Sequence, residues 1–293
     1  MASQQPLTTY LRLSCPRALS QATTHPFLRL AGTGQLGKTT LSQWLSQDRL
    51  YAQSYVRFTG LLLSKIRLPT HNPDSSKPRH PTVENRAFDL LTDALVNIRR
   101  ELAFFESTAD GYGLDLTALP GPQLRTGRIL VPSNGEQARP CSGSSAAEGG
   151  ADLKAVETGC SVFFGPSHVT KAYIDLFMSA GSPAITLLEG FVVLWATEYC
   201  YLQAWKYAAS FGESSVQEEG KEDADGGALR DHFIPNWSSA EFEAFVDTIG
   251  VVLDEMAAQV KGAEETERLR GKCLEWWRQV LWLEAQFWPD VDE

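Results

Sequence analysis

Residues 41–66 read LSQWLSQDRLYAQSYVRFTGLLLSKI, and the rest of the chain is organised around this stretch. Its apolar residues recur at helical spacing and predict one long helix. At about 100° per residue, Trp44, Asp48, Tyr51 and Tyr55 fall within a sector of about 60°. A carboxylate on an apolar helix face is costly to bury unless it has a partner. We therefore expect Asp48 to point into a pocket.

Two later stretches repeat this arrangement of an acid among apolar residues. By the same angular count, Glu198 shares a helix face with Phe191, Leu194, Trp195, Leu202 and Trp205. Glu284 shares one with Trp277, Val280, Leu281, Phe287 and Trp288. We expect the three carboxylates to meet in one pocket of a helical bundle. The alternative is that each acid lies at a helix edge or a subunit interface, paired with Arg or Lys.

Such a pocket has a definite chemistry. A carboxylate in apolar surroundings has a raised pKa and can exchange a proton near neutrality, so one of the acids could act as a general acid or base. Another could stay ionised and hold a cationic or amino-bearing ligand. The aromatic side chains could stack on a flat heterocycle.

The remaining chain also predicts helices, and strand signals are limited to residues 129–131 and 161–164. The helix that carries Asp48 is expected to begin near Thr39 or Thr40, and another at Pro166. The other expected helices cover residues 5–21 (bent at Pro16), 82–108, 184–210, 238–261 (with Glu241 in a capping box) and 264–288. Low-complexity insertions are expected at residues 132–157 and 212–230. The prediction is one all-α domain over residues 1–293, a bundle of about seven helices.

Composition excludes several classes of partner. The net charge of −10 argues against nucleic acid, because phosphate binding needs a basic surface. No apolar run approaches the roughly 18 residues of a membrane-spanning helix. The five cysteines are an odd number without CxxC spacing, which fits a reducing compartment. We expect a cytoplasmic protein; mitochondrial targeting by the acid-free residues 1–47 is a minor alternative.

One motif suggests a nucleotide site. Residues 32–39, GTGQLGKT, match the phosphate-binding pattern GxxxxGK[ST], in which Lys38 would contact the terminal phosphate and Thr39 a magnesium ion. That motif needs a preceding strand and a parallel sheet. The preceding PFLRLA is at best a short strand, and no series of strand–helix units follows. An entry loop into the long helix is therefore favoured over an NTPase.

Metal and nucleophile chemistry find little support. None of the five histidines completes the Glu-x-x-His pair of a di-iron bundle, and no histidine is supported as a haem ligand. Cys200 fits a small buried hydrophobe, and no G-x-S-x-G elbow is present. We expect neither a metal nor another cofactor.

Four segments together resemble the TenA family, also called thiaminase II. They are PFLRLAGTGQLGKTTLSQWLSQDRLYAQSYVRF at 26–58, HVTKAYIDLFMSAGS at 168–182, WATEYCYLQAW at 195–205 and LEAQFW at 283–288. The first resembles the family's opening, with HPF, a Gly-x-Gly loop and a helix containing Q-D-x-x-Y. The third resembles the WAxExxY segment of the branch that has Glu in place of the usual cysteine. The two insertions depart from the family pattern.

The resemblance implies a haem-oxygenase-like helical bundle that needs no haem. It implies a pocket for an aminopyrimidine from thiamin breakdown, in which Asp48 holds the amino group and ring nitrogen. Tyr51, Tyr173 and Tyr201 would line the pyrimidine site. The resemblance also implies a homo-oligomer.

The same resemblance suggests a division of catalytic roles. Counting back four residues from Tyr201 gives Thr197 where the cysteine-bearing branch has its nucleophile, so thiolate chemistry is in doubt. Glu198 matches the Glu branch, which is associated with hydrolytic deamination or deformylation of aminopyrimidines. Glu198 could activate water while Glu284 protonates the leaving amine. The alternatives are a pyrimidine-binding or regulatory protein without turnover, and a metal- or cofactor-using oxidative relative on the same fold.

Overall fold

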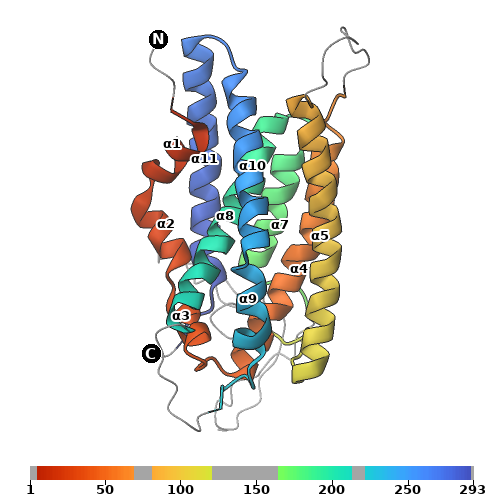
Figure 1. The fold of residues 1–293 in the computed structure, drawn as a ribbon, viewed down its shortest axis with the longest axis vertical. Helices are drawn as coiled ribbons and strands as arrows, with labels where there is room; N and C mark the ends of the chain where they lie inside the picture. Colours follow the sequence, from red (N-terminus) through yellow and green to blue (C-terminus); the bar gives the residue numbers. More distant parts are fainter. Residues whose placement is uncertain (1–4, 69–80, 121–163, 213–221, 292–293) are drawn as a thin grey trace, which may run out of the picture.

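The computed structural model describes residues 5–68, 81–120, 164–212 and 222–291. All secondary structure in these ranges is helical, which confirms the predicted all-α class. Six helices have 14 or more residues: α4 (Lys38–Leu63), α5 (Val83–Tyr112), α7 (His168–Gly181), α8 (Leu187–Gly212), α10 (Ala240–Ala258) and α11 (Ala263–Phe287). Most of them run close to the long axis of the molecule, with α4 and α5 on one side and the short N-terminal helices on the other (Figure 1).

The N-terminal residues form three short helices, α1 (Leu7–Ser14), α2 (Pro16–Thr23) and α3 (Pro26–Gly32). The prediction of one bent helix over residues 5–21 is therefore wrong. Pro16 has no N–H to continue a helix, but it suits the first turn of a new one. The PFLRLA segment is helical and not a strand. The Gly-rich loop thus connects two helices, as the entry-loop interpretation expects.

Helix α4 is the central element. It begins at Lys38, and Gly37 is its N-cap in place of Thr39 or Thr40. Gly37 has an extended backbone and its carbonyl accepts from the Leu41 N–H at 3.0 Å, so no side-chain cap forms. The helix packs against α5 on one side and α7 on another, and its buried residues include Trp44, Asp48 and Tyr55.

Three further helix starts can be compared with their predictions. The helix predicted over 82–108 begins at Val83, and Thr82 caps it by accepting from the Asn85 N–H at 3.3 Å. Helix α7 begins one residue after Ser167, whose hydroxyl accepts from the Thr170 N–H; Pro166 is therefore outside the helix. Ser239 caps α10, which excludes the predicted capping box at Glu241.

Residues 222–230 lie within the second predicted insertion. They fold back on the Gly-rich loop, where the Ala224 N–H donates to the Gly34 carbonyl at 2.9 Å. Asp225 is 1% exposed and accepts from the N–H groups of Gly227 and Leu229. The π-helix η1 (Leu229–Phe233) and helix α9 (Ile234–Trp237) follow. The predicted insertion at 132–157 and the strand signal at 129–131 lie outside the described residues, as does most of 161–164.

Aromatic side chains fill the core below the centre of the bundle. The Trp44 ring packs against Phe27, Trp205, Trp237 and Trp288 at centroid distances of 5.4 to 5.9 Å. Edge and stacked aromatic contacts of this kind add to the stabilisation from burial alone. Among the described helices, none is long and apolar enough to cross a membrane.

Candidate functional site

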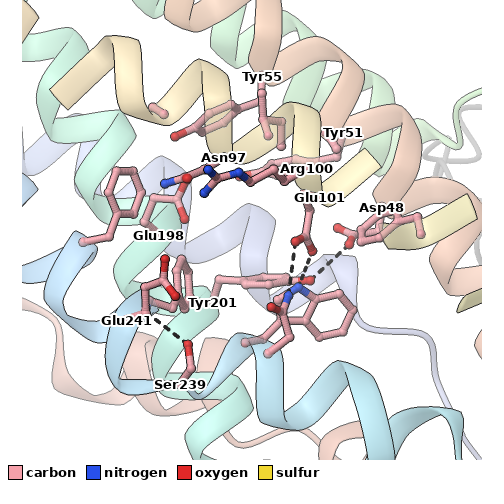
Figure 2. A pocket seen from close by; sticks show the side chains of 18 residues that line it. Asp48, Tyr51, Tyr55, Asn97, Arg100, Glu101, Glu198, Tyr201, Ser239 and Glu241 are labelled. Atoms are coloured by element: carbon pink, nitrogen blue, oxygen red, sulfur yellow. Dashed lines mark hydrogen bonds between the residues drawn. The ribbon is translucent and has the colours of Figure 1, made fainter. Parts of the chain in front are cut away.

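A cavity of about 310 Å³ opens between α4, α5, α8, α9 and α10 (Figure 2). Its walls are mainly aromatic and acidic. The aromatic lining residues are Tyr51, Tyr55, Phe105, Tyr201, Trp237, Phe242 and Phe245. The acidic ones are Asp48, Glu101, Glu198 and Glu241, and the basic one is Arg100. A volume of this size suits a small molecule with one or two rings.

Asp48 lies on the cavity wall, as the helical spacing predicts. It is 3% exposed, and its carboxylate accepts a hydrogen bond from the Tyr201 hydroxyl at 3.1 Å. Burial raises the pKa of Asp48 to about 8; the Tyr201 hydrogen bond opposes this rise, and nearby Glu101 and Glu198 add to it. Asp48 is thus able to bind a ligand either as a proton donor or as an anion near neutral pH.

Glu198 lies on α8, on the wall of the same cavity. Burial raises the pKa of Glu198 to about 7; the neighbouring Tyr55 hydroxyl lowers the pKa and the Glu101 charge raises it. A carboxyl group that titrates near neutrality can both take and give a proton under physiological conditions. Of the predicted residues, Asp48, Tyr51, Glu198 and Tyr201 therefore line one cavity.

Glu284 and Tyr173 lie in a layer behind this wall and not among its lining residues. The Tyr173 hydroxyl donates to the Glu284 carboxylate, and both side chains are at least 96% buried. The Tyr173 ring meets the Tyr51 ring edge-on at a centroid distance of 5.0 Å. Burial raises the pKa of Glu284 to about 8, and the charges of Asp48 and Glu198 add to the rise. The charges of two cavity residues therefore act on Glu284. Glu284 itself does not line the cavity, because Tyr51 forms the wall in front of Tyr173, the residue that donates to Glu284.

Glu101 is a lining residue that the sequence interpretation missed. It accepts hydrogen bonds from the Trp237 indole N–H and, at 3.2 Å, from the Asn236 amide. Burial raises the pKa of Glu101, and these two donors oppose the rise. The sequence does contain a signal, because Ile98, Glu101 and Phe105 follow the same 3- and 4-residue spacing that identified Asp48.

The described residues offer no metal site, and Cys200 is not an activated thiol. No group of three or more His, Cys, Asp or Glu side chains in these ranges is arranged to hold a metal ion. Cys200 is fully buried, and burial raises the pKa of its thiol well above the ordinary value, with the Glu284 charge adding to the rise. A thiol in this environment stays protonated and is a poor nucleophile. Thr197 is also buried and donates to backbone carbonyls of its own helix.

Comparison with known proteins identifies the fold. A TenA homologue from Pyrococcus furiosus superposes with a TM-score of 0.62 at 21% identity, covering 96% of this chain and 98% of that one. The chain has the TenA fold. A TenA family transcription regulator from Silicibacter sp. TM1040 has a TM-score of 0.62 at 15% identity, with 96% and 94% of the two chains covered. A TenA homologue from Pseudomonas syringae gives 0.58 at 12%, covering 98% and 93%.

Sequence comparison adds a longer relative. A probable transcription factor from Fusarium pseudograminearum is 30% identical over 320 residues, which cover 99% of this chain and 54% of the relative. The chain thus spans about half the length of the curated relative that it matches. No protein-family model matches the chain. These comparisons support the predicted TenA-like fold.

Proposed function

We propose that this TenA-fold protein hydrolyses a C–N bond of an aminopyrimidine or formylaminopyrimidine derived from thiamin breakdown. The observation that carries the proposal is the pair Asp48 and Glu198. Both carboxyl groups line one aromatic cavity, and both have pKa values raised close to neutrality. Perturbed acids on the wall of a ligand-sized cavity are typical of catalytic sites.

In the proposed reaction, Asp48 holds the amino group and ring nitrogen of the pyrimidine, and Tyr51 and Tyr201 contact the ring. The Glu198 carboxylate takes a proton from water as the water oxygen bonds to the carbon under attack. The C–N bond then breaks, and the leaving nitrogen takes a proton. We assign that proton to Glu284, with Tyr173 holding its carboxyl group in position. The Tyr51 ring lies against the Tyr173 ring, so the proposed transfer from Glu284 would have to pass the Tyr51 side chain.

The test is a release assay for ammonia or formate with aminopyrimidine and formylaminopyrimidine substrates. Glu198→Gln is expected to lower kcat by about 10²- to 10⁴-fold, the usual contribution of a general acid or base, while pyrimidine binding persists. Glu284→Gln is expected to lower kcat with the fold retained. Exposed Glu264, at the start of α11, provides the matched control Glu264→Gln. Wild-type protein that releases neither product from any of these substrates contradicts the proposal.

A second candidate is ligand binding without turnover, as in a sensor or regulator. Two similar proteins are named a probable transcription factor and a transcription regulator, and the first is nearly twice as long as this chain. This candidate predicts tight pyrimidine binding by calorimetry with no product after prolonged incubation. Cytoplasmic location and homo-oligomer formation remain predictions, and light scattering of the purified chain tests the second.

A further inference from the structure

The cavity has an imbalance of charge. Its lining contains four acids, Asp48, Glu101, Glu198 and Glu241, and one base, Arg100. Arg100 is on the exposed side of α5 and forms no ion pair within the described residues. The buried carboxylates also repel one another, because the charges of Glu101 and Glu198 both act on Asp48. In a medium of low dielectric constant, such like charges are costly unless the carboxyl groups take up protons or a cation joins them.

Glu101 is the acid whose direction is fixed most firmly. Trp237 and Asn236 both donate to its carboxylate from α9, so the group cannot rotate away from the cavity. Two N–H donors stabilise the ionised form of a carboxylate. Each carboxylate oxygen has a second lone pair, so Glu101 can still accept from a ligand. Figure 2 shows Glu101 beside Asp48, on the part of the wall formed by α4 and α5.

Tyr55 provides a separate sign that a ligand belongs in the cavity. The side chain is 2% exposed, yet its hydroxyl has no hydrogen-bond partner of normal geometry within the described structure. The nearby Glu198 and Thr59 side chains shift the pKa of Tyr55, but neither forms a hydrogen bond of standard geometry with its hydroxyl. A buried polar group without a partner is unfavourable and marks a place where a partner is missing. Tyr55 lines the cavity, so a bound molecule can supply that partner.

We propose that Glu101 determines charge selectivity: it binds a cationic ammonium or amidinium group of the ligand and makes the cavity prefer cations over neutral molecules of the same shape. The inference deepens the proposed function, since it concerns the same cavity. The proposal places the cationic group of the ligand on the side of the cavity formed by α5 and α9. A neutral edge of the ligand ring then lies on the opposite side, where the Tyr55 hydroxyl can contact it. A ligand that is both flat and positively charged satisfies the aromatic walls and the acids together.

The test uses two pairs of ligands that differ in charge at one group. Benzamidinium and benzamide have nearly the same shape, and only the first is charged at pH 7. An aminomethylpyrimidine and its N-formyl derivative form the second pair. Dissociation constants are measured by calorimetry for wild type, Glu101→Gln and the control Glu106→Gln. Glu106 is on the same helix, with 65% of its side chain exposed. Glutamine at 101 keeps an oxygen that accepts from Trp237, so the variant removes charge while preserving that contact.

We expect wild type and Glu106→Gln to bind benzamidinium at least about tenfold more tightly than benzamide, and Glu101→Gln to lose most of that preference. Benzamide affinity should be nearly unchanged in Glu101→Gln and the melting temperature should not fall, which a purely structural role would not allow. Equal affinities for both ligands in wild type, or an undiminished preference in Glu101→Gln, overturns the inference. If benzamidinium selectivity holds but neither pyrimidine binds, the proposed function fails and the charge selectivity stands.

Discussion

Replacing Asp48 by asparagine should stabilise the protein at neutral pH, although Asp48 is a proposed ligand anchor. Burial raises the pKa of Asp48 from an ordinary value of 3.8 to about 8, so the folded chain binds this proton more tightly than the unfolded chain. The stabilising contribution of the protonated group is complete below pH 3.8 and is lost as pH rises toward 8. Each pH unit in this window costs about 1.4 kcal/mol of unfolding free energy. At pH 7 the cost is about 4 kcal/mol.

Asparagine has nearly the same shape as aspartate, and its carbonyl can still accept from the Tyr201 hydroxyl. Asp48→Asn should therefore exceed wild type by up to about 4 kcal/mol at pH 7, with little gain at pH 4. Urea unfolding followed by tryptophan fluorescence at pH 4, 5.5 and 7 measures the difference, which corresponds to a midpoint shift of about 1 M or more. The control is Asp247→Asn, an exposed site on α10. A variant less stable than wild type at pH 7, or one with a gain independent of pH, refutes the reasoning.

Three other predictions concern single positions. Gly34→Ala should destabilise by about 1–3 kcal/mol in thermal unfolding, because φ is +70° and a Cβ would approach the Asp223 carboxylate at 2.4 Å. Gly60→Ala, exposed in α4 with no atom within 4 Å of its Cβ, should instead stabilise by about 0.5–1 kcal/mol; the same sign for both glycines would contradict the argument. Tyr173→Phe removes the hydroxyl that lowers the pKa of Glu284, so a pH–rate profile should move to higher pH, and an unchanged profile would exclude the pair from proton transfer.

Helical spacing predicted which side of α4 faces the cavity, but it could not predict where along the helix the cavity begins. Trp44 and Asp48 share one angular sector, yet Trp44 is in the aromatic core and Asp48 is on the cavity wall. Four residues, about 6 Å along the helix axis, separate the two positions. The angular pattern is the same on both sides of the boundary between the aromatic core and the cavity. The position of the boundary depends on α8 and α9, which pack there from distant parts of the sequence.

The acids show the same limit in a different way. Glu198 lines the cavity, whereas Glu284 shares the same sequence pattern but lies one layer behind the wall. A sequence pattern identifies an acid on an apolar face, and it does not distinguish a cavity from a tightly packed layer. Glu101 was missed because its helix was interpreted only from its apolar residues. Its partners Trp237 and Asn236 lie 136 and 135 residues away in the sequence, beyond any local spacing rule.

Residues 222–237 connect the Gly-rich loop to the acids of the cavity. At one end, Asp223 pairs with Arg230, and Ala224 donates to Gly34 in the loop before α4. At the other end, Trp237 donates to Glu101 on α5 and packs against Trp205 of α8 at 4.5 Å. The start of the helix that carries Asp48 and the direction of Glu101 are thus set by one segment. Repelling carboxylates stay close only if the backbone around them resists separation, and this segment contacts the helices that carry them. A change in its position would therefore alter Asp48 and Glu101 together, so the proposed preference for a cation would also depend on residues 222–230, which lie outside the cavity lining.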